Sequence, residues 1–282
     1  MKRLLMTCFI CLGFLLNAQE RYGGLALYTV RDDMAKNPKE TLKQVAEIGY
    51  KNIEAAGYDN GKYYGMSPEA FAATLQKLSL HPLSTHQSSI TLKNADKQFA
   101  AAKKAGFTYF VVPIPPMGMF TFDKKTSEMG MKGSVEELAE ILNALGMKAS
   151  TYGLKLLYHN HDFEFRENDK GVVPIDYLLE NLNKEYVNFE MDLFWVVKAG
   201  ANPVSYFEKY PGRFRFWHVK DMGDNGWFAP VGEGSLDFKS MLKSKEKSGL
   251  EGYFVEQDMT FNFTPIEAIA ISHKALKEIG FD

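Results

Sequence analysis

Cysteine is nearly absent from the sequence. The 282 residues include two cysteines, Cys8 and Cys11, and both lie within the first 18 positions. The rest of the chain therefore has no disulfide framework and no thiolate chemistry. An excess of one charge is missing too, because 33 Lys and Arg residues nearly balance 35 Asp and Glu residues. Without a basic stripe, we expect neither nucleic acid nor an anionic membrane surface as a partner.

Long apolar runs are missing outside the N-terminal segment. Lys2 and Arg3 precede an apolar run over positions 4–16, which ends at Asn17 and Ala18. This arrangement is typical of a secretory signal peptide, and the run is too short to span a membrane comfortably. We predict a signal peptide at 1–18 and a mature chain at 19–282. We also expect an exported, periplasmic protein that does not insert into a membrane after cleavage.

A glycine-rich phosphate turn after the first strand is also missing, which argues against an open dinucleotide-binding sheet. Instead, strand-like and helix-like segments alternate along the mature chain without a linker or a change in composition. Eight such strands predict an α/β protein with a single (β/α)₈ barrel. The expected strands lie at 24–30, 52–55, 82–85, 107–112, 186–191, 214–219 and 253–255, with the fifth running into positions 156–165.

Helices are expected between these strands. Proline in the first turn and Ser, Thr or Asp at the N-cap mark several of their starts. The segment 113–132 is rich in Pro, Gly, Met and Phe and is predicted to be a long loop, either a lid or a dimer contact. The expected helices begin at Pro38, Pro68, Val135 and Pro203 or cover 93–105, 174–183, 237–248 and 265–279.

The stretch 156–165 brings two histidines to the end of an apolar run. Because a strand has a period of two, His159 and His161 leave it on the same face. Two imidazoles projecting together suit a divalent metal or a proton-transfer site, and Glu164 adds a carboxylate nearby. Two solvated loop histidines are the alternative interpretation.

Other strand ends repeat this pattern. In a (β/α)₈ barrel the active site lies at the carboxyl ends of the strands. A set of His, Asp and Glu side chains converging there favours one divalent metal ion, such as Mn²⁺, Mg²⁺, Co²⁺ or Zn²⁺. The residues at predicted strand ends are Glu54, His86, His159, His161, Asp192, His218 and Glu256.

Each of these residues has a structural alternative. Asp192 could cap a helix that runs through Trp195, and His218 could be a hydrogen-bonded core histidine. Glu256 is harder to explain structurally, since a carboxylate that ends an apolar strand needs a partner. Glu54 and His86 could simply bind substrate hydroxyls or backbone.

The sequence resembles the xylose-isomerase-like barrel proteins that are often labelled sugar phosphate isomerase/epimerase. The resemblance covers the whole mature chain, and it implies a barrel with one divalent metal held by the fifth to eighth strands. By position, Asp192, His218 and Glu256 match three of that family's four ligands. The resemblance rests on Asn52-Ile53-Glu54, His159-Asn160-His161, Met191-Asp192, His218-Val219-Lys220-Asp221, the loop 231–238 and Val255-Glu256.

Two departures from the family pattern bear on the chemistry. His159 stands where the epimerases place their first Glu, and Trp195 stands where many members place a His, so a two-Glu proton shuttle is not expected. The Tyr-His-x-His and His-x-Lys-Asp patterns resemble the inosose dehydratase branch, which eliminates water beside a ketone. Similar barrels act as lyases on 3-keto-glycosides.

This resemblance gives each candidate residue an expected role. The predicted metal ligands are His159, Asp192, His218 and Glu256. His161 is the leading acid or base, with Lys220 and Glu164 as second choices. The residues expected to bind substrate are Glu54, His86, Trp195 and Asp221.

Three functions follow for a small carbohydrate substrate. The first is a metal-dependent lyase or dehydratase that removes a proton beside a sugar ketone, and the second is an isomerase or epimerase with the same metal. The third is a non-catalytic, exported sugar-binding barrel. Because sugar phosphates are cytoplasmic and no Arg cluster is present, a neutral keto-sugar or keto-glycoside is expected. A homo-oligomer is compatible with the sequence.

Overall fold

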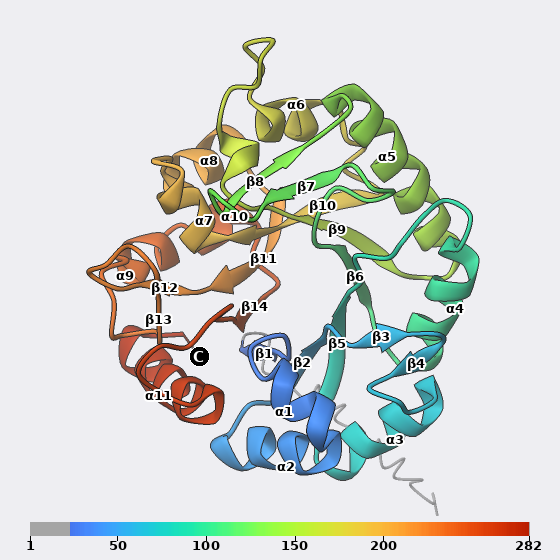
Figure 1. Cartoon of the computed structure of the whole chain (residues 1–282), viewed down its shortest axis with the longest axis vertical. Coiled ribbons are helices and arrows are strands. Elements are labelled where there is room, and N and C mark those ends of the chain that lie inside the picture. Colours follow the sequence, from blue (N-terminus) through green and yellow to red (C-terminus); the bar gives the residue numbers. More distant parts are fainter. Residues whose placement is uncertain (1–22, 282) are drawn as a thin grey trace, which may run out of the picture.

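The computed structural model describes residues 23–281, and the signal peptide expected at 1–18 lies outside these described residues. Eight parallel strands close into a barrel in the order β1-β14-β11-β10-β9-β6-β5-β2 (Figure 1). The first strand pairs with both the second and the last, which closes the ring and confirms the (β/α)₈ prediction. The strands are β1 (Gly24–Ala26), β2 (Asn52–Ala55), β5 (His81–His86), β6 (Tyr109–Val112), β9 (Lys155–His159), β10 (Val187–Asp192), β11 (Phe214–Val219) and β14 (Gly252–Val255).

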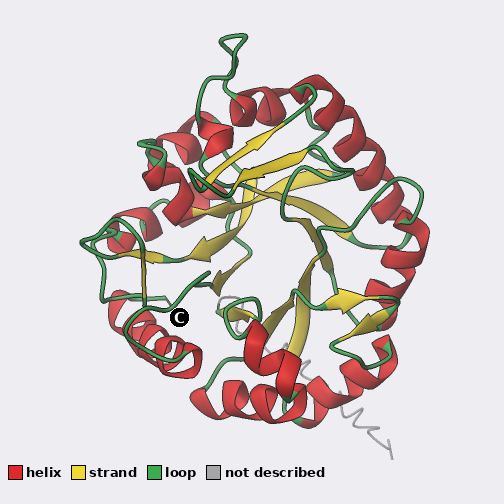
Figure 2. Ribbon diagram, in the orientation of Figure 1, coloured by secondary structure: helices red, strands yellow, loops and turns green. Residues whose placement is uncertain are grey.

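Helices form an outer layer around the strands (Figure 2). Their starts follow the sequence signals, since Asn37, Ser67, Ser134 and Thr264 each accept a backbone hydrogen bond at an N-cap. The helices are α1 (Arg31–Lys36), α2 (Pro38–Ile48), α3 (Pro68–Lys77), α4 (Ala95–Lys104), α5 (Val135–Thr151), α6 (Pro174–Asn181), α7 (Leu193–Lys198), α8 (Pro203–Lys209), α9 (Phe238–Leu242), α10 (Lys245–Ser248) and α11 (Pro265–Ile279), with a short 3₁₀ turn, η1 (Phe163–Phe165).

Four segments differ clearly from the sequence prediction. The fifth strand, β9, ends at His159, so His161 lies beyond the strand and not on it. The first strand ends at Ala26, because the chain turns at once into α1 rather than continuing to residue 30. The single helix expected at 237–248 is two short helices, α9 and α10. The segment 113–132 is no plain loop, since it contains an antiparallel hairpin of β7 (Phe120–Asp123) and β8 (Glu128–Met131).

Two more hairpins lie outside the barrel. One pairs β3 (Tyr58–Asp59) with β4 (Lys62–Tyr63), and the other pairs β12 (Asp221–Met222) with β13 (Phe228–Ala229). Both follow barrel strands, β2 and β11, and so belong to the loops at the carboxyl ends of the strands. These loops are where a barrel of this class builds its site. No helix within residues 23–281 is long and apolar enough to cross a bilayer.

The barrel interior changes from apolar to polar along its axis. Alternate strand residues point inward, and one group of them packs together as an apolar plug of Ala26, Tyr109, Val111, Leu157, Phe216 and Phe254. Two residues beyond Leu157 and Phe216, toward the carboxyl ends of β9 and β11, the inward positions are the buried His159 and His218. Polar groups buried on top of an apolar plug require partners, and they find them in one another. The residues of this polar layer are Glu54, His86, His159, Glu190 and His218.

Candidate metal centre

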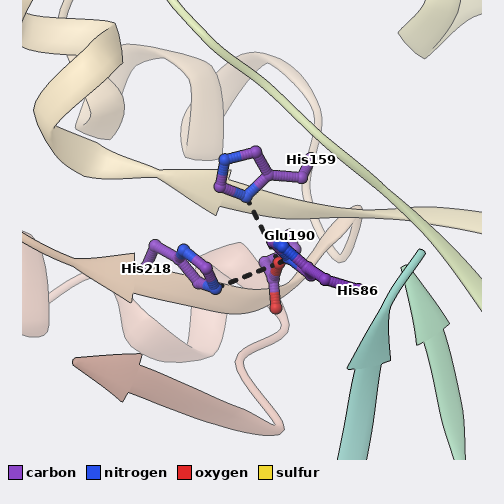
Figure 3. Close-up of side chains that lie close together, drawn as sticks. All are labelled: His86, His159, Glu190 and His218. Atoms are coloured by element: carbon purple, nitrogen blue, oxygen red, sulfur yellow. Dashed lines mark hydrogen bonds and ion pairs between the residues drawn. The ribbon is translucent and has the colours of Figure 1, made fainter. Parts of the chain in front are cut away.

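The carboxylate of Glu190 lies at the middle of the polar layer. Its Oε2 atom is 2.6 Å from His86 Nε2, 3.2 Å from His218 Nε2 and 3.3 Å from His159 Nδ1. Figure 3 shows the three imidazoles around this one carboxylate. The second oxygen, Oε1, is buried and has no hydrogen-bond partner. We call these four residues, His86, His159, Glu190 and His218, the lower set.

Glu54 borders the lower set from β2. Its Oε1 atom lies 2.8 Å from His218 Nε2 and 3.2 Å from His86 Nε2. Ser84 donates a 2.7 Å hydrogen bond to Oε2, which fixes the orientation of the carboxylate. Glu54 and His86, predicted to bind substrate, are therefore part of the buried polar layer at the base of the site.

The four predicted metal ligands also come together, with two of them in the polar layer and two on the side toward the carboxyl ends of the strands. His159, Asp192, His218 and Glu256 each offer a ligand atom, and the four atoms lie within 4.8 Å of one another. His218 Nδ1 is 2.9 Å from Glu256 Oε2 and 3.9 Å from Asp192 Oδ2. We call these four residues the upper set. It shares His159 and His218 with the lower set.

Lys220 occupies the upper set with its ammonium group. Its Nζ atom is 2.9 Å from Asp192 Oδ2, 2.8 Å from Glu256 Oε2 and 2.5 Å from Asp258 Oδ2. The Lys220 side chain is fully buried, so these carboxylates replace its water shell. An ammonium has three N–H donors, and three carboxylates surround it.

Asp192 also performs the structural role that the sequence left open. Its Oδ1 atom accepts a 3.1 Å hydrogen bond from the backbone N–H of Trp195 and so caps α7. The other oxygen, Oδ2, faces Lys220 and the two histidines. One carboxylate thus begins a helix and takes part in the charged cluster.

Electrostatics within the cluster separate its members. Burial raises the pKa of Glu54 to about 7 and that of Asp192 to about 6. Burial also opposes charge on Glu190 and on His218, but attraction to the opposite charges around each of them outweighs it: the neighbouring histidines for Glu190 and the neighbouring carboxylates for His218. The pKa of Glu190 is accordingly held well below its usual range, and that of His218 well above. In the low dielectric of the barrel centre, a nearby positive charge strongly stabilises the ionised carboxylates.

The donor set fits a divalent cation. Five carboxylates, two of them fully buried on one strand, share the centre with a single lysine. Imidazole nitrogens and carboxylate oxygens are the ligands of zinc and of similar first-row ions. Glu190 Oε1 is buried without a hydrogen-bond partner, and a divalent cation would supply the partner that a buried carboxylate oxygen needs.

An aromatic wall stands beside the cluster and contains His161. The His161 ring centre lies 5.1 Å from that of His159, 5.6 Å from Trp195 and 6.4 Å from Phe163. Burial in these surroundings holds the pKa of His161 well below its usual value, so the imidazole is neutral. Its Nδ1 and the indole Nε1 of Trp195 are buried without a hydrogen-bond partner. Both atoms are therefore available to a ligand.

Two predicted site residues make other contacts. Glu164 accepts a 2.7 Å hydrogen bond from the Tyr158 hydroxyl and a 2.9 Å bond from the backbone N–H of His161. Tyr158 belongs to the core between the strands and the helices, so Glu164 is on the outer side of the barrel wall. The structure therefore joins it to the His161 backbone and not to the charged cluster.

Asp221 organises a loop. Its two oxygens accept hydrogen bonds of 2.8–3.2 Å from four backbone N–H groups, those of Met222, Gly232, Gly234 and Leu236. A Cβ atom at Gly234 would lie 2.3 Å from Asp221 Oδ1, so glycine is needed there for close approach. With both oxygens used in this way, Asp221 holds the 231–237 segment in place.

Sequence reasoning missed Glu190 and Asp258. Each lies two residues from a candidate, Glu190 before Asp192 and Asp258 after Glu256. The strand period of two places Glu190 on the same face of β10 as Asp192, so for Glu190 the signal was present in the sequence. Asp258 lies beyond the end of β14, where strand alternation does not predict its direction.

Comparison with known proteins gives a consistent picture. The model of the family described as "Xylose isomerase-like TIM barrel" matches residues 42–279. The chain is 27% identical to an inosose dehydratase of Lacticaseibacillus casei over 144 residues, which are 44% of this chain and 47% of the relative. It is 27% identical to an inosose dehydratase of Clostridium beijerinckii over 162 residues, covering 50% of this chain and 53% of the relative. The chain thus spans about half the length of these curated relatives.

Solved structures agree on the fold. A sugar phosphate isomerase/epimerase from Parabacteroides distasonis superposes with a TM-score of 0.76 at 23% identity, covering 94% of this chain and 96% of that one. The IolI protein, solved with a bound zinc atom, gives a TM-score of 0.68 at 18% identity over 90% and 96% of the two chains. At these identities the likeness establishes the fold.

Proposed function

Because the chain belongs to the Xylose isomerase-like TIM barrel family, we propose that it is a divalent-metal-dependent enzyme acting on a small carbohydrate. The reaction we propose removes the proton beside the carbonyl of a keto-sugar or keto-glycoside and then eliminates the oxygen substituent of the next carbon. The observation that carries this proposal is the buried, unpartnered Nδ1 of His161 next to the His and carboxylate cluster.

One Mn²⁺, Mg²⁺, Co²⁺ or Zn²⁺ ion would be held inside this cluster. The four predicted ligands, His159, Asp192, His218 and Glu256, converge there together with His86 and Glu190. A C–H group beside a carbonyl is too weakly acidic for a side chain to remove its proton at neutral pH unless the enolate is stabilised. A bound divalent ion would act as a Lewis acid and supply that stabilisation.

His161 moves the proton in this proposal. A neutral imidazole whose Nδ1 has no partner can accept a proton from the substrate carbon as the C–H electron pair enters the enolate. The enolate then re-forms the carbonyl, the bond between the next carbon and its oxygen breaks, and the leaving oxygen takes the proton from His161. The same imidazole therefore acts first as base and then as acid.

Lys220 positions charge rather than moving a proton. Its three donors face Asp192, Glu256 and Asp258, so no N–H is left for the substrate. Trp195 has the opposite character, because its Nε1–H is buried without an acceptor. We assign Trp195 Nε1 to a substrate oxygen and Lys220 to the fixed positive charge of the site. The bond to Trp195 would keep the substrate against the aromatic wall.

The N-terminal segment guides the choice of substrate. We propose that residues 1–18 direct export to the periplasm, where a neutral keto-sugar is available and cytoplasmic sugar phosphates are not. Recovery of a mature chain that begins at Gln19 from the periplasmic fraction would support this location. Recovery of the uncleaved chain from the cytoplasm would contradict it.

Proton NMR in D₂O tests the reaction. We would incubate the metal-loaded protein with a 3-keto-glucoside and compare it with an Asp192→Ala variant. Loss of the C2 proton signal together with release of the aglycone is the expected result. Exchange or isomerisation without release would favour an isomerase or epimerase, and the absence of exchange with any keto-sugar would favour a sugar-binding protein.

A further inference from the structure

The cluster contains two adjacent positions for a cation, and the two shared histidines face both. His218 turns Nε2 toward Glu190 Oε2 at 3.2 Å and Nδ1 toward Glu256 Oε2 at 2.9 Å. His159 turns Nδ1 toward Glu190 Oε2 at 3.3 Å and Nε2 toward Asp192 Oδ2 at 3.9 Å. Each imidazole therefore presents one nitrogen to the lower set and the other to the upper set.

The upper position already holds a positive charge. The Lys220 ammonium lies 2.9 Å from Asp192 Oδ2 and 2.8 Å from Glu256 Oε2, the same oxygens that face the histidine nitrogens. A metal ion binds carboxylate oxygen at about 2.0–2.2 Å, so an ion on these two oxygens would lie against the ammonium group. In a fully buried site, two cations so close together repel strongly.

The lower position holds no lysine or arginine among the described residues. Three imidazole nitrogens lie within 3.3 Å of Glu190 Oε2, and the Oε1 atom of that carboxylate is buried without a partner. Three histidines and one carboxylate are a ligand set that suits zinc, cobalt or manganese. Glu54 Oε1, 2.8 Å from His218 Nε2, places a further oxygen beside them.

The upper carboxylates are arranged as supports for this lower site. A histidine that binds metal through one nitrogen usually gives its other ring nitrogen to a carboxylate, which orients the ring. Glu256 Oε2 stands at 2.9 Å from His218 Nδ1, on the side of the ring away from Glu190. Asp192 stands more loosely beside His159 Nε2, at 3.9 Å.

We infer that the divalent ion is held by His86, His159, Glu190 and His218, and that the Lys220 ammonium is the resident cation of the Asp192–Glu256 position. The inference rests on the proposed function only in requiring that the protein bind a divalent ion. It keeps two of the four predicted ligands, His159 and His218. It changes Asp192 and Glu256 from ligands into groups that fix Lys220 and orient the histidines.

A matched pair of variants on β10 separates the two positions. Glu190→Gln and Asp192→Asn each replace a fully buried carboxylate with an amide of the same size. After metal removal with EDTA, we would measure Zn²⁺ and Co²⁺ affinity by competition with a chelator, and thermal unfolding would verify that each variant is folded.

The inference predicts that Glu190→Gln weakens Zn²⁺ binding by more than about 100-fold, beyond the 10–100-fold typical of groups that only orient a ligand. Asp192→Asn should weaken it by less than about 100-fold. The reverse order, or equal losses above 100-fold in both variants, would overturn the assignment and leave metal dependence intact. A wild-type protein that binds neither ion would overturn the proposed function and the inference with it.

X-ray absorption of the Zn²⁺-loaded wild-type protein provides a test without mutation. The lower set contains three imidazoles and the upper set contains two. Imidazole scattering that requires three histidines on the metal is the expected result. A fit with two histidines would overturn the assignment, even if a variant had failed to fold.

Discussion

The Nζ atom of Lys220 lies 2.8 Å from Oε2 of Glu256, with both side chains buried above the centre of the barrel. A buried charge pair of this kind contributes little net stability when intact, yet removing one partner leaves the other charge without compensation. Lys220 contacts two further carboxylates, so it is the member whose loss leaves the most charge behind.

Lys220→Met should therefore destabilise the metal-free protein by about 3–5 kcal/mol, the cost of leaving buried carboxylates unpaired. Urea unfolding in the presence of EDTA measures this loss. Lys155→Met is the matched control, since Lys155 pairs with Glu251 at 3.2 Å on the surface. That exposed pair should be worth about 1 kcal/mol or less. Equal losses for the two variants would contradict the structural role of Lys220.

Asp221→Asn should release the 231–237 segment. The carboxylate accepts four backbone N–H bonds, and an amide offers one oxygen and two competing N–H donors. These donors are part-buried, so each one left unpaired should cost less than the roughly 1–3 kcal/mol of a fully buried donor. Hydrogen exchange should rise at Gly232, Gly234 and Leu236. Asp237→Ala, which removes only the N-cap of α9, should leave that exchange unchanged and cost about 1 kcal/mol.

Glu164 should make stability depend on pH. Burial raises its pKa to about 8 in the folded chain, whereas an unfolded glutamate titrates near about 4.3. Between these values the folded state binds the extra proton, so stability falls as pH rises, by up to about 1.4 kcal/mol per pH unit.

Glu164→Gln should remove this slope, because the amide can still accept from the His161 backbone and donate to Tyr158. Denaturant unfolding of both proteins from pH 5 to pH 8 measures the difference in their free energies of unfolding. A difference that stays constant over this range would show that Glu164 is ionised in the folded protein.

His161→Asn should slow C2-proton exchange by about 10²–10⁴-fold, the usual contribution of a positioned acid or base. Affinity for the metal should change little, because His161 belongs to neither ligand set. His81→Asn provides the matched control, since His81 is exposed at the amino end of β5. A His161→Asn variant that keeps the wild-type exchange rate would exclude His161 as the base.

The barrel was predictable because its strands and helix starts follow from local sequence patterns, namely apolar strand segments and the proline and N-cap residues that begin helices. Pro265 and Ile279 bound the last helix in the structure as they do in the prediction. The 113–132 segment was misread as a loop because its Gly and Pro content obscured the alternation of Phe120–Asp123, which pairs with Glu128–Met131. A hairpin of this kind depends on a partner strand, which composition alone does not reveal.

The site was partly predictable for a related reason. Strand ends identified His159, Asp192, His218 and Glu256, and the structure brings them together. The sequence could not show that Lys220 fills the space between Asp192 and Glu256. The three residues come from three different strands, and their contact depends on how far each side chain reaches in the folded barrel. The position of Glu164 was also not predictable, because its partner Tyr158 lies on the outer face of its strand and draws Glu164 away from the site.

The most direct test of the central claim is a metal titration of C2-proton exchange. Metal-free protein would receive increasing Zn²⁺, Co²⁺ or Mn²⁺, and mass spectrometry would follow deuterium uptake by a 3-keto-glucoside in D₂O. We predict that exchange rises in proportion to bound metal and levels off at one ion per chain. Exchange at the full rate without metal would contradict a metal-assisted proton abstraction.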